Sequence, residues 1–110
     1  LGTNLQNVNL SLIYAMNFVE AGQYRNAVSA LDTVLVKSEL ERKVKLISIA
    51  EAFLELKDFR KSKESLLKAE KIFSDDNYRN TYLLYLFAKY YLETNQPEEF
   101  RNYFEKAQES

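Results

Sequence analysis

Apolar side chains recur at intervals of three and four residues along almost the whole chain. This spacing gathers apolar side chains on one side of an α-helix, so the pattern predicts helices joined by short polar connections. We expect six helices, near residues 4–21, 24–37, 39–56, 59–73, 78–94 and 97–108.

Residues that commonly begin or end helices lie at the borders of these segments. Gly22 can end the first helix, because glycine tolerates the left-handed backbone conformation found there. Ser38 and Glu41 have the spacing of a capping box at the start of the third helix. Asp58 can cap the fourth helix, and Pro97 suits the first turn of the sixth. The borders therefore support the helix pattern.

Three stretches of the chain share one arrangement, and they span residues 18–35, 53–70 and 91–108. Each opens with an aromatic and an aliphatic residue on one helix, passes a polar turn and enters a second helix. The second stretch follows the first by 35 residues, and the third follows the second by 38. The three additional residues fall in the polar linker at 74–77. We therefore interpret the chain as a series of two-helix repeats.

A unit of about 34 residues with two helices resembles the tetratricopeptide repeat (TPR) family, and the resemblance covers about residues 8–110. The positions that carry it are a small residue on the first helix (Ala15, Ala50, Ala88), an aromatic three residues later (Phe18, Phe53, Tyr91) and a small residue on the second helix (Ala27, Ser62). The sequence departs from the family at Phe100, which stands where the third small residue is expected, and it lacks the closing proline.

The resemblance implies one all-α domain over residues 1–110, with repeats near 8–38, 43–74 and 81–110. It implies a right-handed α-α superhelix, or solenoid, of about three TPR-like helix-turn-helix hairpins. In this family the first helix of each hairpin lines the concave side of the solenoid. The alternative is a plain six-helix bundle whose residue spacing is coincidental.

Composition and charge narrow the classes of function. The 110 residues include 15 basic and 16 acidic side chains, so the formal net charge of −1 gives no overall attraction to nucleic acid or to a membrane surface. Histidine and cysteine are absent, which removes the commonest general base and the commonest zinc ligands. No apolar run is long enough to span a membrane. We expect no catalysis, cofactor, metal site, nucleic-acid partner or membrane partner, and a cytoplasmic location by default.

Most positions that the repeat register projects onto the concave side are apolar or aromatic. Because a contiguous apolar surface usually marks a binding site, we predict a non-catalytic protein–protein interaction scaffold that holds an apolar peptide or helix in this groove. We expect Glu51 and Lys89 to set the orientation of the partner. The predicted contact residues are Leu12, Met16, Ile47, Glu51, Leu54, Tyr82, Tyr85, Leu86, Lys89 and Leu92.

The best-known use of the fold, a clamp for the acidic tails of chaperones, is not expected here. That clamp needs Lys, Asn and Arg at particular first-helix positions, which in this chain hold Leu12, Met16, Ser48, Tyr82 and Leu86. None of these side chains is positively charged, so a bound carboxylate would lose its hydration without gaining an ionic partner.

Other interpretations stay open. The chain is alternatively a self-associating structural segment of a larger helical-repeat protein, or a homodimer, because its first helix is apolar on nearly every face, with Leu10 and Ile13 as the expected contacts. A further alternative is a peptide-sensing domain of a bacterial regulator. An anion or nucleic-acid binder would use the basic clusters at 42–45 and 57–63, but acidic side chains interleave with both. Lastly, the groove could be closed, with its residues serving as core.

Overall fold

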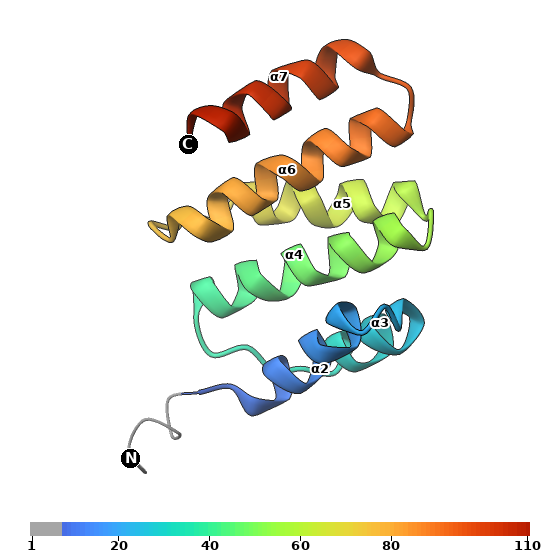
Figure 1. Ribbon diagram of the computed structural model, residues 1–110. Coiled ribbons are helices and arrows are strands. Elements are labelled where there is room, and N and C mark those ends of the chain that lie inside the picture. The colour runs from blue at the N-terminus through green and yellow to red at the C-terminus, as the bar shows by residue number, and fades with distance from the viewer. Residues whose placement is uncertain (1–7) are drawn as a thin grey trace.

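Six helices follow one another along residues 8–110, the part of the chain that the computed structural model describes. They are α2 (Leu10–Glu20), α3 (Tyr24–Asp32), α4 (Glu39–Glu55), α5 (Phe59–Glu70), α6 (Asn77–Glu93) and α7 (Pro97–Glu109). Consecutive helices pair into the hairpins α2–α3, α4–α5 and α6–α7, which stack one on the next (Figure 1). These residues form no strand, so the predicted all-α superhelix of two-helix repeats is confirmed.

The first two helices are shorter than the sequence pattern predicts. α2 begins at Leu10, because the side chain of Asn9 accepts a hydrogen bond from the Leu12 N–H (3.1 Å) and caps the helix. Residues 4–7 of the predicted first helix lie outside the described part of the chain. α3 ends at Asp32 and not at residue 37, so that prediction was wrong.

The chain leaves the helix after Asp32 because its backbone groups find other partners. The Thr33 hydroxyl donates to the Ala30 carbonyl (2.9 Å), and the Lys45 ammonium of α4 donates to the Val34 carbonyl (2.9 Å). The side chain of Val34 is buried in the core. Threonine and valine are weak helix formers, since their branched side chains are restricted in a helix. Contacts with α4 therefore override the local periodicity.

The predicted caps of α4 and α5 are present. The Ser38 hydroxyl accepts from the Glu41 N–H (3.1 Å), and the Asp58 carboxylate accepts from the Lys61 N–H (3.2 Å). The other half of the capping box is shifted, because the Glu41 carboxylate accepts from the Lys37 N–H (2.8 Å), one residue before the position that a capping box uses. Glu41 thus fixes the loop that leads into α4.

The turn inside each hairpin has the same backbone geometry. We call positions equivalent when they differ by 35 residues between the first and second hairpins, or by 38 between the second and third. Gly22, Lys57 and Asn95 are equivalent and have φ angles of 76°, 64° and 59°. The residue after each donates its N–H to a carbonyl five residues earlier (2.8–2.9 Å). Gly22 therefore ends α2 in the left-handed conformation, as predicted.

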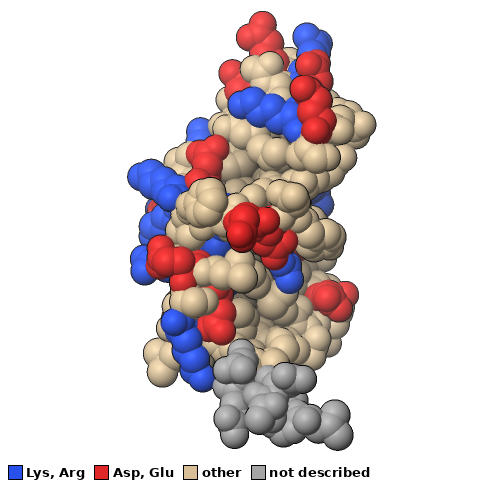
Figure 2. Space-filling view, turned by 90° about the vertical axis from the view of Figure 1, so that its left-hand side faces the viewer, with Lys and Arg blue, Asp and Glu red and all other residues tan. Residues whose placement is uncertain are grey.

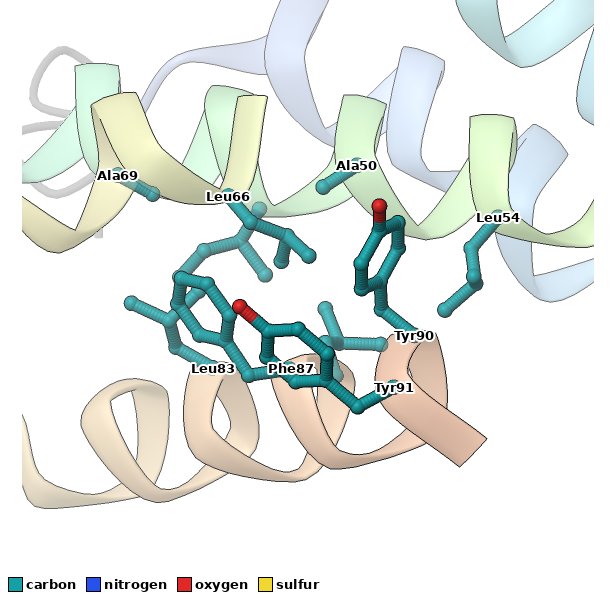
Figure 3. Packing of buried hydrophobic residues seen from close by; sticks show 10 residues of the cluster. Ala50, Leu54, Leu66, Ala69, Leu83, Phe87, Tyr90 and Tyr91 are labelled. Carbon is teal, nitrogen blue, oxygen red and sulfur yellow. The ribbon is translucent and has the colours of Figure 1, made fainter. Parts of the chain in front are cut away.

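The hydrophobic core consists of two clusters that meet at α4. The first cluster lies between the α2–α3 hairpin and α4, and it includes Leu12, Val19 and Leu31. The second lies between α4, α5 and the α6–α7 hairpin. Figure 3 shows side chains of the second cluster, among them Ala50, Leu54, Leu66, Leu83, Phe87, Tyr90 and Tyr91. Successive hairpins are thus joined by apolar packing on both sides of α4.

Small residues let the two helices of a hairpin approach closely. Ala27 and Ser62 are fully buried at the predicted small position, and the Ser62 hydroxyl donates to the Ala50 carbonyl of α4 (3.0 Å). Phe100 occupies this position in the third hairpin. It is partly buried and stacks on Phe104, with ring centroids 5.5 Å apart. The third hairpin is therefore packed through aromatic rings where the others use small residues.

Two lysines of the basic segment 42–45 serve the fold. Lys43 is buried, and its ammonium donates to the Ile72 carbonyl (2.7 Å) just beyond the end of α5. Burial lowers the pKa of Lys43, and the negative charge of Glu70 partly opposes this. Lys45 is half-buried and donates to the loop before α4. Neither ammonium is left free for an external anion, which weakens the nucleic-acid alternative.

Candidate functional site

The first helices of the three hairpins form one side of the stack. α4 packs against α2 on one side and against α6 on the other, while α3 and α5 pack behind them (Figure 1). The concave surface that the sequence predicts would be built by this row of α2, α4 and α6.

A hollow opens on this row, and all three first helices contribute to its wall. Its volume is about 130 Å³. An engineered protein cavity of roughly 150 Å³ holds one benzene molecule, whereas sites for larger ligands occupy about 300–1,000 Å³. The hollow therefore has room for one side chain. It is lined by Met16, Val19, Glu20, Ile47, Ser48, Glu51, Tyr78, Arg79 and Tyr82.

A half-buried tyrosine and a carboxylate are hydrogen-bonded to each other in the wall of the hollow. The Tyr82 hydroxyl donates to the Glu51 carboxylate (2.6 Å). Burial raises the pKa of Tyr82 above its usual value, and the hydrogen bond to Glu51 raises it further. The hydroxyl therefore remains a donor at neutral pH. The exposed ring of Tyr78 stacks on Tyr82 with centroids 6.3 Å apart, and Arg79 lies 5.6 Å from the Tyr78 ring.

Ion pairs connect α4 and its following turn to α6. Lys89 pairs with Glu55, and Lys57 pairs with Glu93. The hydrogen bond to Glu55 raises the pKa of Lys89 against the effect of burial, so this ammonium stays charged. Both groups that the sequence predicts to orient a partner, Glu51 and Lys89, thus have partners within the chain.

The ten predicted contact residues fall into three groups. Leu12, Ile47, Leu54 and Leu86 are buried between helices. Met16, Glu51 and Tyr82 are half-buried, and Tyr85, Lys89 and Leu92 are exposed. The hollow brings together Met16, Ile47, Glu51 and Tyr82 from this set. Because Leu12, Leu54 and Leu86 pack inside the stack and are absent from the hollow, we leave them out of the binding surface.

Five residues of the hollow are absent from the predicted contacts. The repeat register projects Val19, Glu20 and Ser48 onto the concave side, whereas Tyr78 and Arg79 lie outside that projection. In the third hairpin, the projected concave positions begin at Tyr82, whereas its first helix, α6, begins one turn earlier, at Asn77. Tyr78 precedes Tyr82 by four residues, which places the two side chains on the same face of a helix. Extending the apolar stripe back by one turn would have found Tyr78.

Both ends of the stack expose apolar side chains. At the amino-terminal end, Leu10 and Ile13 are exposed on α2, as the self-association hypothesis requires. At the carboxy-terminal end, Tyr85, Leu92 and Phe104 are exposed, and the rings of Tyr85 and Phe104 meet edge to face at 6.0 Å. These two sets are separate from the hollow.

Charged groups of both signs are interspersed on the face shown in Figure 2. The described residues contain no cluster of acidic side chains that could hold a metal ion. None of the described helices combines the length and the hydropathy that crossing a membrane requires.

Comparison with known proteins gives one family. The sequence profile of the tetratricopeptide repeat matches residues 46–76 and 81–110. The first match covers most of the α4–α5 hairpin and the second covers the α6–α7 hairpin, so together they span more than half of the chain. The α2–α3 hairpin lies outside both matches but repeats the same turn geometry. Neither a curated protein nor a solved structure matches this chain.

Proposed function

Since the chain belongs to the tetratricopeptide repeat family, whose repeats mediate protein–protein interactions, we propose that it binds a peptide segment of another protein across α2, α4 and α6. The hollow between these helices carries the proposal. Met16, Tyr82 and the exposed ring of Tyr78 offer apolar surface around this depression. As in other members of the family, the role is that of a non-catalytic scaffold.

The size of the hollow limits what binds there. A single apolar side chain of the partner fits into it, whereas a whole helix face does not. Burying one leucine-sized or phenylalanine-sized side chain contributes about 1.5–3 kcal/mol before ordering costs. Because association itself costs about 4 kcal/mol or more, this contact alone gives weak binding and needs contacts from the flanking residues of the peptide.

The charges beside the hollow favour one orientation of the peptide. Glu20 comes from α2 and Arg79 from α6, on opposite sides of α4. An extended segment that crosses the three helices would meet a negative side chain on α2 and a positive one on α6, with the Glu51 carboxylate between them already bound to the Tyr82 hydroxyl. The preferred partner therefore carries a basic residue near Glu20, an apolar residue at the hollow and an acidic residue near Arg79.

Selection from a displayed library of random peptides tests this proposal. We expect the selected peptides to share an apolar residue flanked by charges of opposite sign. Tyr78→Ala should weaken their binding at least about tenfold, measured by fluorescence anisotropy, because it removes the exposed ring beside the hollow. Tyr14→Ala is the matched control, since Tyr14 is a similarly exposed tyrosine on α2 outside the hollow. Peptides that bind both variants equally well would refute the assignment.

A further inference from the structure

The contact between successive hairpins uses the same three positions twice. In the first hairpin these positions hold Leu12, Val19 and Leu31. In the second hairpin they hold Ile47, Leu54 and Leu66. All six side chains are at most 8% exposed, because α4 covers the first set and α6 covers the second. The three positions therefore mark the surface on which the next hairpin packs.

The same positions are uncovered in the third hairpin. They hold Tyr85, Leu92 and Phe104, which are 38–57% exposed. The side chains are at least as large as their counterparts and, apart from the Tyr85 hydroxyl, which accepts a hydrogen bond from Gln108 (3.2 Å), they are apolar. Among the described residues, no further helix packs on them. The α6–α7 end thus presents a complete packing surface of the kind that the chain fills twice within itself.

The opposite end carries the other half of this interface. α6 packs on the preceding hairpin through Leu83, Leu86, Phe87 and Tyr90, which are buried. The equivalent positions on α2 hold Leu10, Ile13, Tyr14 and Asn17. The three apolar side chains among them are 47–64% exposed. α2 therefore presents an apolar stripe at the positions with which α6 packs onto its preceding hairpin.

We propose that copies of this chain associate head to tail, with α2 of one copy packed against α6 and α7 of another. The contact continues the interface that α4 makes with the first hairpin and that α6 makes with the second. A second copy is the occupant because the two exposed ends carry the two halves of one interface that already forms within each chain. The proposal concerns the ends of the stack and leaves the hollow open.

The charges are compatible with this packing. α2 carries a single charged side chain, Glu20. By equivalence with the pair Lys57–Glu93, Glu20 would face Asn95 of the other copy, which is uncharged. By the same rule Arg101, the counterpart of Lys63, would lie near Asn17 and Phe18 of α2. Lys63 itself lies 5.5–5.7 Å from the rings of Tyr90 and Tyr91, so a cation is accommodated at this position.

The proposed contact joins two different surfaces, and this distinguishes it from a symmetric dimer. Each copy that binds through one end leaves its other end free. The association therefore continues beyond two copies, into a ring or an open filament. This consequence makes the proposal testable by variants that disable one end at a time.

Sedimentation across a concentration series tests the association. We expect the mass of the unmodified chain to rise from 12.9 kDa past that of a dimer. Leu10→Glu disables α2 and Leu92→Glu disables the α6–α7 end, so each variant alone should remain at 12.9 kDa. Both residues are more than half exposed, so the folded monomer should tolerate either change. Circular dichroism verifies that the helices persist.

The control is Leu67→Glu, which places an acid on an exposed leucine away from both ends. The equivalent positions in the other two hairpins hold Asp32 and Glu105, so the fold tolerates an acidic side chain here. The change should therefore leave the association intact. A mixture of Leu10→Glu and Leu92→Glu provides the decisive result. Each variant keeps the end that the other lacks, so the mixture should form a complex of two chains, 25.8 kDa (twice 12.9 kDa), and nothing larger.

Three results would overturn the proposal. The first is a chain that stays monomeric at about 1 mM, where even weak contacts form. The second is an association that Leu10→Glu abolishes and Leu92→Glu leaves unchanged, which indicates a symmetric contact between two α2 helices. The third is a mixture that stays monomeric. None of these results bears on the hollow, whose test depends on Tyr78.

Discussion

Leu54 and Leu92 are the same residue at equivalent positions, and the fold predicts opposite sensitivities for them. Leu54 is 1% exposed because α6 covers it. Leu92 lies on α6, the first helix of the last hairpin, and is 57% exposed. Truncating both to alanine removes identical atoms. We therefore expect the loss of stability to depend only on whether the next hairpin is packed on the side chain.

The magnitudes follow from burial. Leu54→Ala removes a fully buried side chain and leaves a cavity, which typically costs about 2–5 kcal/mol, and we take about 3 kcal/mol. Leu92→Ala removes a side chain that is less than half buried and leaves no cavity. Since about 0.4 of the leucine side chain is buried, the substitution should cost about that fraction of the transfer free energy of a leucine, or about 0.5–1 kcal/mol. The ratio of the two losses is therefore about four.

Urea denaturation followed by far-ultraviolet circular dichroism measures both losses. With a slope of about 1.5 kcal/mol per M, the midpoint should fall by about 2 M for Leu54→Ala and about 0.5 M for Leu92→Ala. The protein concentration is kept in the low micromolar range so that Leu92 is not covered by a second copy. Equal shifts, or a larger shift for Leu92→Ala, would show that α6 does not cover Leu54 and would refute the stacking described above.

Three further substitutions test the wall of the hollow and the turn between helices. Tyr82→Phe removes the hydrogen bond to Glu51 and should cost about 0.5–1.5 kcal/mol. Because the folded pKa of Tyr82 is raised above the unfolded value of about 10, its contribution is complete below that pH and is lost as the pH rises above it. Urea midpoints measured on both sides of about pH 10 should therefore fall less steeply for Tyr82→Phe than for the unmodified chain, and parallel slopes would contradict this. Gly22→Ala should cost about 1 kcal/mol, since φ is 76° and the added methyl group meets no neighbour within 4 Å. Lys57→Gly, at the equivalent position, should stabilise the chain in a thermal-unfolding assay, because the strain relieved at φ 64° outweighs the loss of the exposed ion pair with Glu93. A neutral result for both changes would argue against the left-handed turn.

Local signals in the sequence were sufficient for most of the secondary structure. Helical periodicity and the caps at Ser38 and Asp58 depend on residues within one or two turns, so they can be recognised without knowing the fold. The end of α3 depends on Lys45, which binds the Val34 carbonyl from another helix. A contact over eleven residues leaves no trace in the local pattern, so the helix was extended too far.

The binding surface was less predictable for a related reason. The first helix of a hairpin has the same pattern of apolar residues whether it packs on three neighbouring helices or lines an open groove. Ile47 and Tyr85 illustrate this, because they are equivalent and both apolar, yet only Ile47 is covered by a following hairpin. Whether an apolar position is core or surface is decided by the neighbouring hairpin, which the residue's own sequence environment does not specify.

The division of the core at α4 has a consequence for motion over time. The α2–α3 hairpin consists of helices of 11 and 9 residues, which are held to the rest by one apolar cluster. Separating it from α4 leaves the second cluster, and with it α4 to α7, intact. Such a unit opens with less free energy than the whole chain requires. The stack therefore has a more transient end and a more persistent end, and backbone amides of α2 and α3 exchange with solvent through openings that the α6 amides do not share.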